Sequence, residues 1–241
     1  MATTTKSSPK TTTKASATKE IAKAKKASVV EQEETTAEIR IEPFRQETIL
    51  IPIKGISPLI QHAFSEKARK QLLDSMSGVK TVKAERKAKD PIAEFEDAKY
   101  LLPDGRAGHP VVAFKAATVD ACSLFDKSVT KVAMKRALFF AGEGPDMLVP
   151  LEYDECEMRE DTPRVGMGSI DLRYRPAYHN WKCVLEITYL PHLINMDSVV
   201  SLVNAGGLGG VGEWRPSAPK SNSGVFGRYE VDFDRGITVV K

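Results

Sequence analysis

Apolar and polar residues alternate strictly between residues 181 and 189, which predicts the clearest strand of the chain. The apolar positions fall on one face of this strand, and they are Trp181, Cys183, Leu185, Ile187 and Tyr189. The opposite face carries Lys182, Glu186 and Thr188. One buried face and one wet face are typical of an antiparallel sheet whose helices lie on one side only. The pattern therefore predicts an α+β fold.

The first predicted strand lies near residue 50, where Ile49, Ile51 and Ile53 alternate with polar or small residues. Pro52 lies inside this strand. Because proline has no backbone N–H to donate to a neighbouring strand, it favours a sheet edge or a bulge. Further strands are predicted over residues 147–152, 155–159, 169–174 and 226–233.

Helical segments alternate with these strands. Ser65 is a good N-cap for a helix over residues 66–76, and a proline opens a second helix over 91–100. Apolar residues predict a buried helix over 112–125, and a short helix is predicted over 196–205. Residues 129–140 fit a helix and a strand equally well.

Positive charge gathers in two segments. The first 28 residues carry seven lysines and Glu20, or +6, whereas the whole chain carries +3. Residues 1–37 contain no aromatic residue, so we expect a disordered tail before a single domain over 38–241. The tail is either an arm that attracts phosphates or a solubilising leader. The second segment, 79–90, is predicted to be a mobile loop that orders on nucleic acid, and its cations are Lys80, Lys83, Arg86, Lys87 and Lys89.

Composition excludes several classes of protein. No apolar stretch approaches the roughly 18 residues of a membrane span, and we expect neither a secretory signal nor a membrane partner. Cys122, Cys156 and Cys183 lie far apart without zinc-ligand spacing. They indicate reduced thiols and a cytoplasmic protein, in the host cytoplasm if the chain is viral. We expect no metal or other cofactor.

A glycine-rich stretch follows the last predicted helix. Gly207, Gly209 and Gly212 satisfy the spacing GxGxxG. A dinucleotide site needs that motif after a strand and before a helix, whereas here it follows a helix, and Pro216 and Pro219 oppose a helix after it. The stretch therefore does not predict a nucleotide cofactor.

The same stretch, GGLGGVGEWRPSAPKSNSGVFGRYEV at 206–231, resembles the C-terminal glycine-rich loop of the RAMP superfamily, the RNA-binding subunits and endoribonucleases of CRISPR systems. The resemblance implies a ferredoxin-like βαββαβ core, enlarged here by insertions. The globular part is also similar to a family of uncharacterised tailed-phage proteins. The sequence segments that carry this similarity are SPL at 57–59, FSEKA at 64–68, MRED at 158–161, DLRYRP at 171–176 and GEWRP at 212–216.

The residues also predict a nucleic-acid site without the resemblance. Glycines let a backbone approach a phosphate, and Trp214 beside Arg215 offers a stacking plane and a cation. Arg173 and Arg175 share one strand face, which we expect to be exposed. The other candidates are Arg159, Arg164, Gly209, Gly210, Gly212 and Lys220. Alternatively, Trp214 belongs to the core and the arginines pair with Glu157, Glu160, Asp161 and Asp171.

Three functions remain open. The first is sequence-independent binding of single-stranded RNA, or less favourably DNA, by a subunit that self-associates into a filament or ring. The second is a metal-independent endoribonuclease with His62 as general base. The third is a viral structural or scaffold protein, in which the same edges mediate assembly only.

Overall fold

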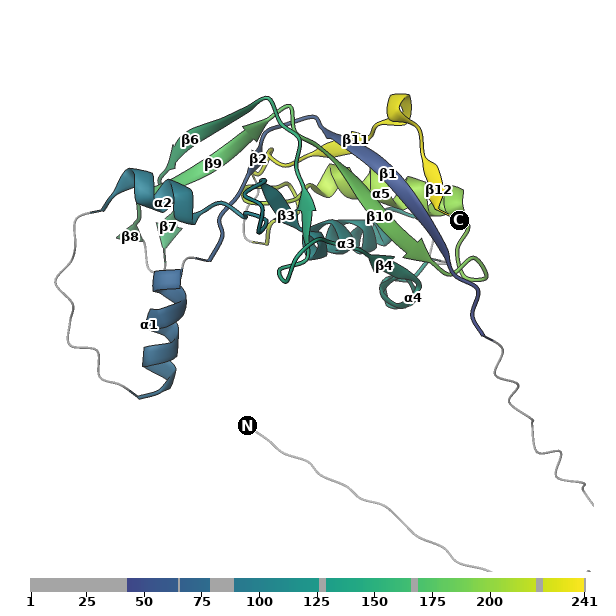
Figure 1. Ribbon diagram of the computed structural model, residues 1–241, viewed down its shortest axis with the longest axis horizontal. Coiled ribbons are helices and arrows are strands. Elements are labelled where there is room, and N and C mark those ends of the chain that lie inside the picture. Colours follow the sequence, from purple (N-terminus) through teal and green to yellow (C-terminus); the bar gives the residue numbers. More distant parts are fainter. Residues whose placement is uncertain are drawn as a thin grey trace, which may run out of the picture. The chain divides into compact units, whose positions relative to one another are not determined.

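A five-stranded antiparallel sheet forms the centre of the fold in the computed structural model (Figure 1). The structure describes residues 43–64, 66–78, 89–125, 129–165, 169–219 and 223–240. The sheet has the order β11–β1–β10–β4, with β12 also paired to β1. These strands are β1 (Glu47–Gly55), β4 (Leu138–Phe140), β10 (Lys182–Tyr189), β11 (Tyr229–Val231) and β12 (Thr238–Val240).

The connections make this sheet ferredoxin-like. Helix α3 (Val111–Asp120) lies between β1 and β4 along the chain, and helix α5 (Met196–Gly209) lies between β10 and β11. The last strand of this βαββαβ unit therefore pairs with the first, and the first pairs with the third. This order confirms the predicted α+β class with an antiparallel sheet.

Burial confirms that the helices cover one face of the sheet. Trp181, Leu185 and Ile187 are fully buried, whereas Lys182 and Glu186 between them are exposed. Figure 1 shows α3 and α5 on the same side of β1 and β10. The alternation in the sequence therefore predicted the buried and exposed sides of β10 correctly.

Pro52 lies in a central strand, and the structure accommodates it by breaking the neighbouring strand. The backbone N–H of Asp232 donates to the carbonyl of Pro52 at 2.8 Å, so the backbone of Pro52 faces β11 and β12. At this point the chain leaves the sheet through a 3-10 turn (Phe233–Arg235) between β11 and β12. The position at which Pro52 lacks an N–H therefore faces the interruption between β11 and β12, where no ladder hydrogen bond is required.

The helices differ from the prediction mainly at their ends. Helix α1 (Glu66–Met76) begins and ends where predicted, and α2 (Pro91–Asp97) is shorter than predicted. The ambiguous segment contains both alternatives, because α4 (Lys131–Ala137) runs directly into β4. A 3-10 helix (Ala121–Leu124) follows α3. None of the helices in the described ranges has the length and apolar character to cross a membrane.

A second, three-stranded sheet has the order β2–β9–β6. Its strands are β2 (Leu59–Ile60), β6 (Glu155–Asp161) and β9 (Arg173–His179), and α2 packs on one face (Figure 1). The predicted strand 169–174 is wrong in its bounds, because Asp171 and Leu172 are not in a strand and separate β8 from β9. The remaining strands pair as β3 (Gly108–Pro110) with β5 (Leu148–Pro150), and β7 (Arg164–Val165) with β8 (Ser169–Ile170).

Candidate nucleic-acid interface

Three basic residues lie in one row across the small sheet. Arg159 on β6 is the register partner of Arg175 on β9. On the other side of β9, Ile60 pairs with Ala177, and the backbone N–H of Gln61 donates to the carbonyl of Pro176 at 3.1 Å. His62 follows Gln61 directly, beyond the end of β2, and the charge of Arg175 acts on its imidazole. Directly opposed residues such as Arg159 and Arg175 have Cβ atoms about 5 Å apart. We call His62, Arg175 and Arg159 the basic row.

Arg175 is buried, which contradicts the prediction that it is an exposed sheet arginine. Its side chain is 2% exposed, because the loop after α5 covers this face of the sheet. Nη1 lies 3.4 Å from Oδ2 of Asp161, and Nη2 lies 3.9 Å from Oε2 of Glu213. Nε is buried without a hydrogen-bond partner among the described residues. Burial lowers the pKa of Arg175, so the nearby carboxylates do not fully offset the cost of burying its positive charge.

The neighbouring arginines are paired with carboxylates, as the alternative interpretation expects. Nε of Arg159 donates to Oδ1 of Asp161 at 2.7 Å. The carboxylate of Asp161 therefore accepts hydrogen bonds from two guanidiniums of the basic row. Nε of Arg173 donates to Oδ2 of Asp171 at 3.0 Å, and Nζ of Lys89 donates to Oδ1 of the same carboxylate at 2.7 Å.

The glycine-rich stretch is helix first and loop second. Gly209 is the last residue of α5, Gly210 caps it with a φ of 69°, and Gly212 in the loop has a φ of 77°. A Cβ on Gly212 would lie 2.5 Å from the carbonyl oxygen of Ile60. The N–H of the following Glu213 donates to that same oxygen at 2.9 Å. Only glycine lets the loop approach the small sheet so closely.

Trp214 and Arg215 hold this loop in an unusual conformation. Trp214 is half-buried with a φ of 55°, a region that bulky residues rarely adopt. Its indole Nε1 is buried without a partner among the described residues. Nη1 of Arg215 donates to the carbonyl of Gly212 at 2.8 Å. Backbone strain of this kind persists where the surroundings impose it, and it concentrates at functional sites.

The segment 224–227, with glycines at both ends, closes the loop and brings an aromatic ring to the basic row. The N–H of Phe226 donates to the carbonyl of Trp214 at 3.1 Å. The guanidinium carbon of Arg159 lies 4.6 Å from the centroid of the Phe226 ring. This cation–π contact joins the loop to β6, so the loop and the small sheet form one surface.

His62 is the exposed end of the basic row. Burial by its neighbours lowers the pKa of its imidazole, and the charges of Arg175 and Arg173 lower it further. The carboxylates of Glu213 and Asp171 act in the opposite direction but more weakly. His62 is therefore neutral near pH 7 and lies among cations.

A buried polar cluster beneath the row was missed by the sequence reasoning. Nε2 of Gln61 donates to the carbonyl of Gly108 at 2.7 Å and lies 3.3 Å from Nδ1 of His109. Burial, together with the charge of Arg215, lowers the pKa of His109 to about 3. No pattern in the sequence marks these two residues, because they lie 48 positions apart and neither belongs to a recognisable motif.

Several predicted residues cannot be placed in this interface. Lys80, Lys83, Arg86, Lys87 and Lys220 lie outside the described residues, as do the tail and its predicted boundary at 37–38. The side chain of Arg164 is likewise not described, although its backbone belongs to β7. Within the described ranges, no three His, Cys, Asp or Glu side chains come together as a metal site.

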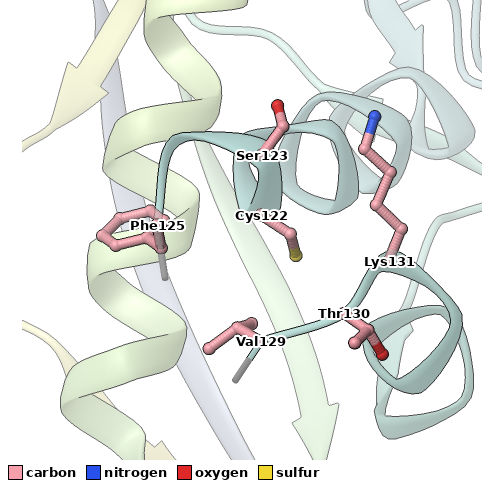
Figure 2. Close-up of a pocket in the computed structure, with 6 residues that line it drawn as sticks. All are labelled: Cys122, Ser123, Phe125, Val129, Thr130 and Lys131. Atoms are coloured by element: carbon pink, nitrogen blue, oxygen red, sulfur yellow. The ribbon is translucent and has the colours of Figure 1, made fainter. Parts of the chain in front are cut away.

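A hollow of about 320 Å³ lies elsewhere, between the end of α3 and the start of α4 (Figure 2). Cys122, Phe125 and Val129 border it, and Figure 2 shows the ammonium of Lys131 pointing away from them. That ammonium donates to Asp120 at 2.9 Å, and burial raises the pKa of the Cys122 thiol. The hollow thus offers no activated nucleophile or free cation among its described residues.

Comparisons with known proteins find similar solved structures only. No family model and no curated protein matches the chain. Cmr6 from Pyrococcus furiosus is 10% identical with a TM-score of 0.39, covering 78% of this chain and 100% of its own. A chain of the type III-B Cmr-beta complex bound to cognate target RNA is 10% identical with a TM-score of 0.41. This match covers 82% of the present chain and 61% of the other. The strand order itself carries the fold assignment.

Proposed function

We propose that the protein binds single-stranded nucleic acid, RNA in preference to DNA, at the face formed by the basic row and the glycine loop. The observation that carries this proposal is the pairing of Arg175 with Arg159 across β9 and β6, with His62 close to Arg175. Like charges directly opposite each other on a sheet destabilise it. A chain of phosphates along the row would supply the missing negative charge.

The surroundings of the row support sequence-independent binding. Arginine is well suited to phosphate, because its planar donors match the oxygens in pairs. Phe226 lies against Arg159 of the row, and Trp214, hydrogen-bonded to Phe226 through its backbone, adds a second aromatic side chain to the same loop on which a base could stack. The preference for RNA, and the assembly of several copies along one strand, rest on the resemblance of the loop to that of the RAMP superfamily.

The binding test uses a fluorescently labelled oligouridylate and measures affinity by anisotropy over a range of salt. Arg159→Ala and Arg173→Ala should each make the plot of log K against log salt shallower by about 0.7. Trp214→Ala should leave that slope unchanged and weaken binding by about 1–3 kcal/mol if the indole stacks. Arg136→Ala, which removes an exposed arginine of α4 at the other end of β10, is the matched control.

A second candidate function, metal-independent RNA cleavage, is favoured by the position of His62. A neutral imidazole beside two arginines is suited to take a proton from a 2′-hydroxyl while the arginines hold the phosphodiester. The same samples test this candidate when the RNA is recovered after incubation with a chelator. Cleavage that is lost in His62→Ala supports the enzyme, and intact RNA supports a binding protein. Absence of binding at low salt supports the scaffold alternative instead.

A further inference from the structure

The basic row contains one residue whose charge can change near neutral pH. Arg175 and Arg159 remain charged throughout the physiological range, whereas a histidine titrates within it. Gln61 is hydrogen-bonded through its backbone to Pro176, so the next residue, His62, lies near Arg175, and its imidazole can gain a proton only close to a fixed positive charge. The free protein therefore disfavours a protonated His62, and an anion held between the two side chains would remove that penalty.

We propose that His62 takes up a proton when a phosphate or sulfate anion binds in the basic row, so that anion binding strengthens as the pH falls. This inference rests on the proposed function and adds its regulation. The buried Nε of Arg175, which has no partner among the described residues, is the donor that the anion would satisfy. His62, at the exposed end of the row, is where the anion enters.

The groups that face His62 are consistent with this coupling. Arg173 and Arg175 on β9 repel its proton, while Asp171 before β9 and Glu213 in the loop attract it. The hydroxyl of Tyr100, after α2, donates to the backbone carbonyl of His62 at 3.5 Å and not to its imidazole. On the far side of Arg175, Asp161 already accepts from two arginines. The nearby carboxylates therefore do not neutralise all the positive charge of the row, so a bound anion would be stabilised there.

Proton uptake is measured by calorimetry of the full chain with a short deoxythymidine oligonucleotide. This probe lacks a 2′-hydroxyl and its phosphodiesters do not titrate, so neither cleavage nor ligand protonation contributes. Titrations in two buffers of different ionisation enthalpy give the number of protons bound. We expect uptake approaching one proton per site, and affinity that rises by up to about tenfold for each unit of falling pH.

NMR of the His62 ring provides an independent measurement with sulfate as the probe. Saturating sulfate should raise the pKa of His62, because the anion stabilises the imidazolium. Arg173→Gln should raise the pKa of His62 in the free protein, because one of the repelling charges is gone. His62→Gln should abolish proton uptake. His192→Gln, which alters a ring stacked on Phe44, is the matched control and should leave the uptake intact.

The outcomes separate this inference from the proposed function. Oligonucleotide binding with no net proton uptake, or with the same uptake in His62→Gln, overturns the proton coupling and leaves the binding function standing. A sulfate-induced rise in the pKa of His62 without any oligonucleotide binding overturns the nucleic-acid function and supports the anion site. Sulfate that leaves the His62 titration unchanged overturns the anion site.

Discussion

The two sheets of this protein both bury apolar side chains but differ in the charged groups that they bury. The five-stranded sheet buries isoleucines of β1 and the indole of Trp181, whose Nε1 donates to the carbonyl of Ser57 at 2.9 Å. The three-stranded sheet buries the charged Arg175, whose Nε has no partner among the described residues. His109 on β3, next to Gln61, retains such a nitrogen as well, whereas the unpartnered group in the described part of the large sheet is the hydroxyl of Tyr229. Buried polar groups of native proteins are normally satisfied, so such exceptions point to a missing ligand or water.

The difference indicates a division of work within one compact unit, Pro43–Lys241. Apolar burial in the large sheet contributes stability that depends little on pH or on dissolved anions. Charged and titratable groups in the small sheet cost stability and make it depend on pH and anions. Substitutions in the two sheets should therefore differ in how they affect stability and binding.

The largest effect should come from the large sheet. Trp181 is fully buried and contacts Phe114 and Tyr229, so Trp181→Ala should remove about 3–5 kcal/mol from the free energy of unfolding. Val184→Ala on the open face of the same strand is the control and should change it by less than about 0.5 kcal/mol. Urea unfolding measures both, and a Trp181→Ala protein as stable as the wild type would contradict this division of work.

A smaller effect should appear on acidification, and it should originate at His109 on β3. Burial lowers the pKa of His109 to about 3, whereas an unfolded histidine titrates near its usual value of about 6.5. Below about pH 6.5 the unfolded chain binds a proton at His109 and the folded chain does not. The free energy of unfolding therefore decreases as the pH is lowered from about 6.5 to about 3. At about pH 5 this loss amounts to about 2 kcal/mol for His109 alone.

The variant His109→Gln isolates this contribution. Its free energy of unfolding should fall less between about pH 7.5 and 5 than that of the wild type, by about 2 kcal/mol. The lowered pKa of His62 acts in the same direction and persists in this variant. Equal pH dependence in both proteins would show that His109 is protonated in the folded state.

Local patterns predicted much of the fold, because they reflect neighbours along the chain. The alternation in β10 and the bounds of α1 depend on the periodicity of a single segment. The glycine stretch was predicted less well, since its first residues extend α5. A Cβ on Gly207 would lie 1.8 Å from the carbonyl oxygen of Tyr229, so this glycine serves close packing of helix and strand.

The candidate site depended on contacts that no local pattern contains. Periodicity places Arg173 and Arg175 on the same face of a strand, yet it does not say that a distant loop covers that face. The proximity of His62 to Arg175 follows from the pairing of β2 with β9, which are separated by more than 100 residues. The sequence reasoning therefore identified the residue types of the site but missed their order and burial.

The smallest effect on stability, and the sharpest contrast between the two sheets, should come from Arg175→Met. A buried ion pair gives little net stability, because desolvation offsets the attraction between the charges. Methionine fills a similar volume, and Asp161 keeps its shorter contact with Arg159, at 2.7 Å. We therefore expect the free energy of unfolding to stay within about 1 kcal/mol of the wild type or to rise.

The same substitution should weaken oligonucleotide binding, which separates a functional arginine from a structural one. Loss of one phosphate contact should lower the salt slope by about 0.7, and proton uptake at His62 should fall because the bound anion has lost its buried donor. A stable Arg175→Met protein with undiminished binding would remove Arg175 from the interface. An unfolded one would show that the small sheet needs this charge for its structure, as the large sheet needs Trp181.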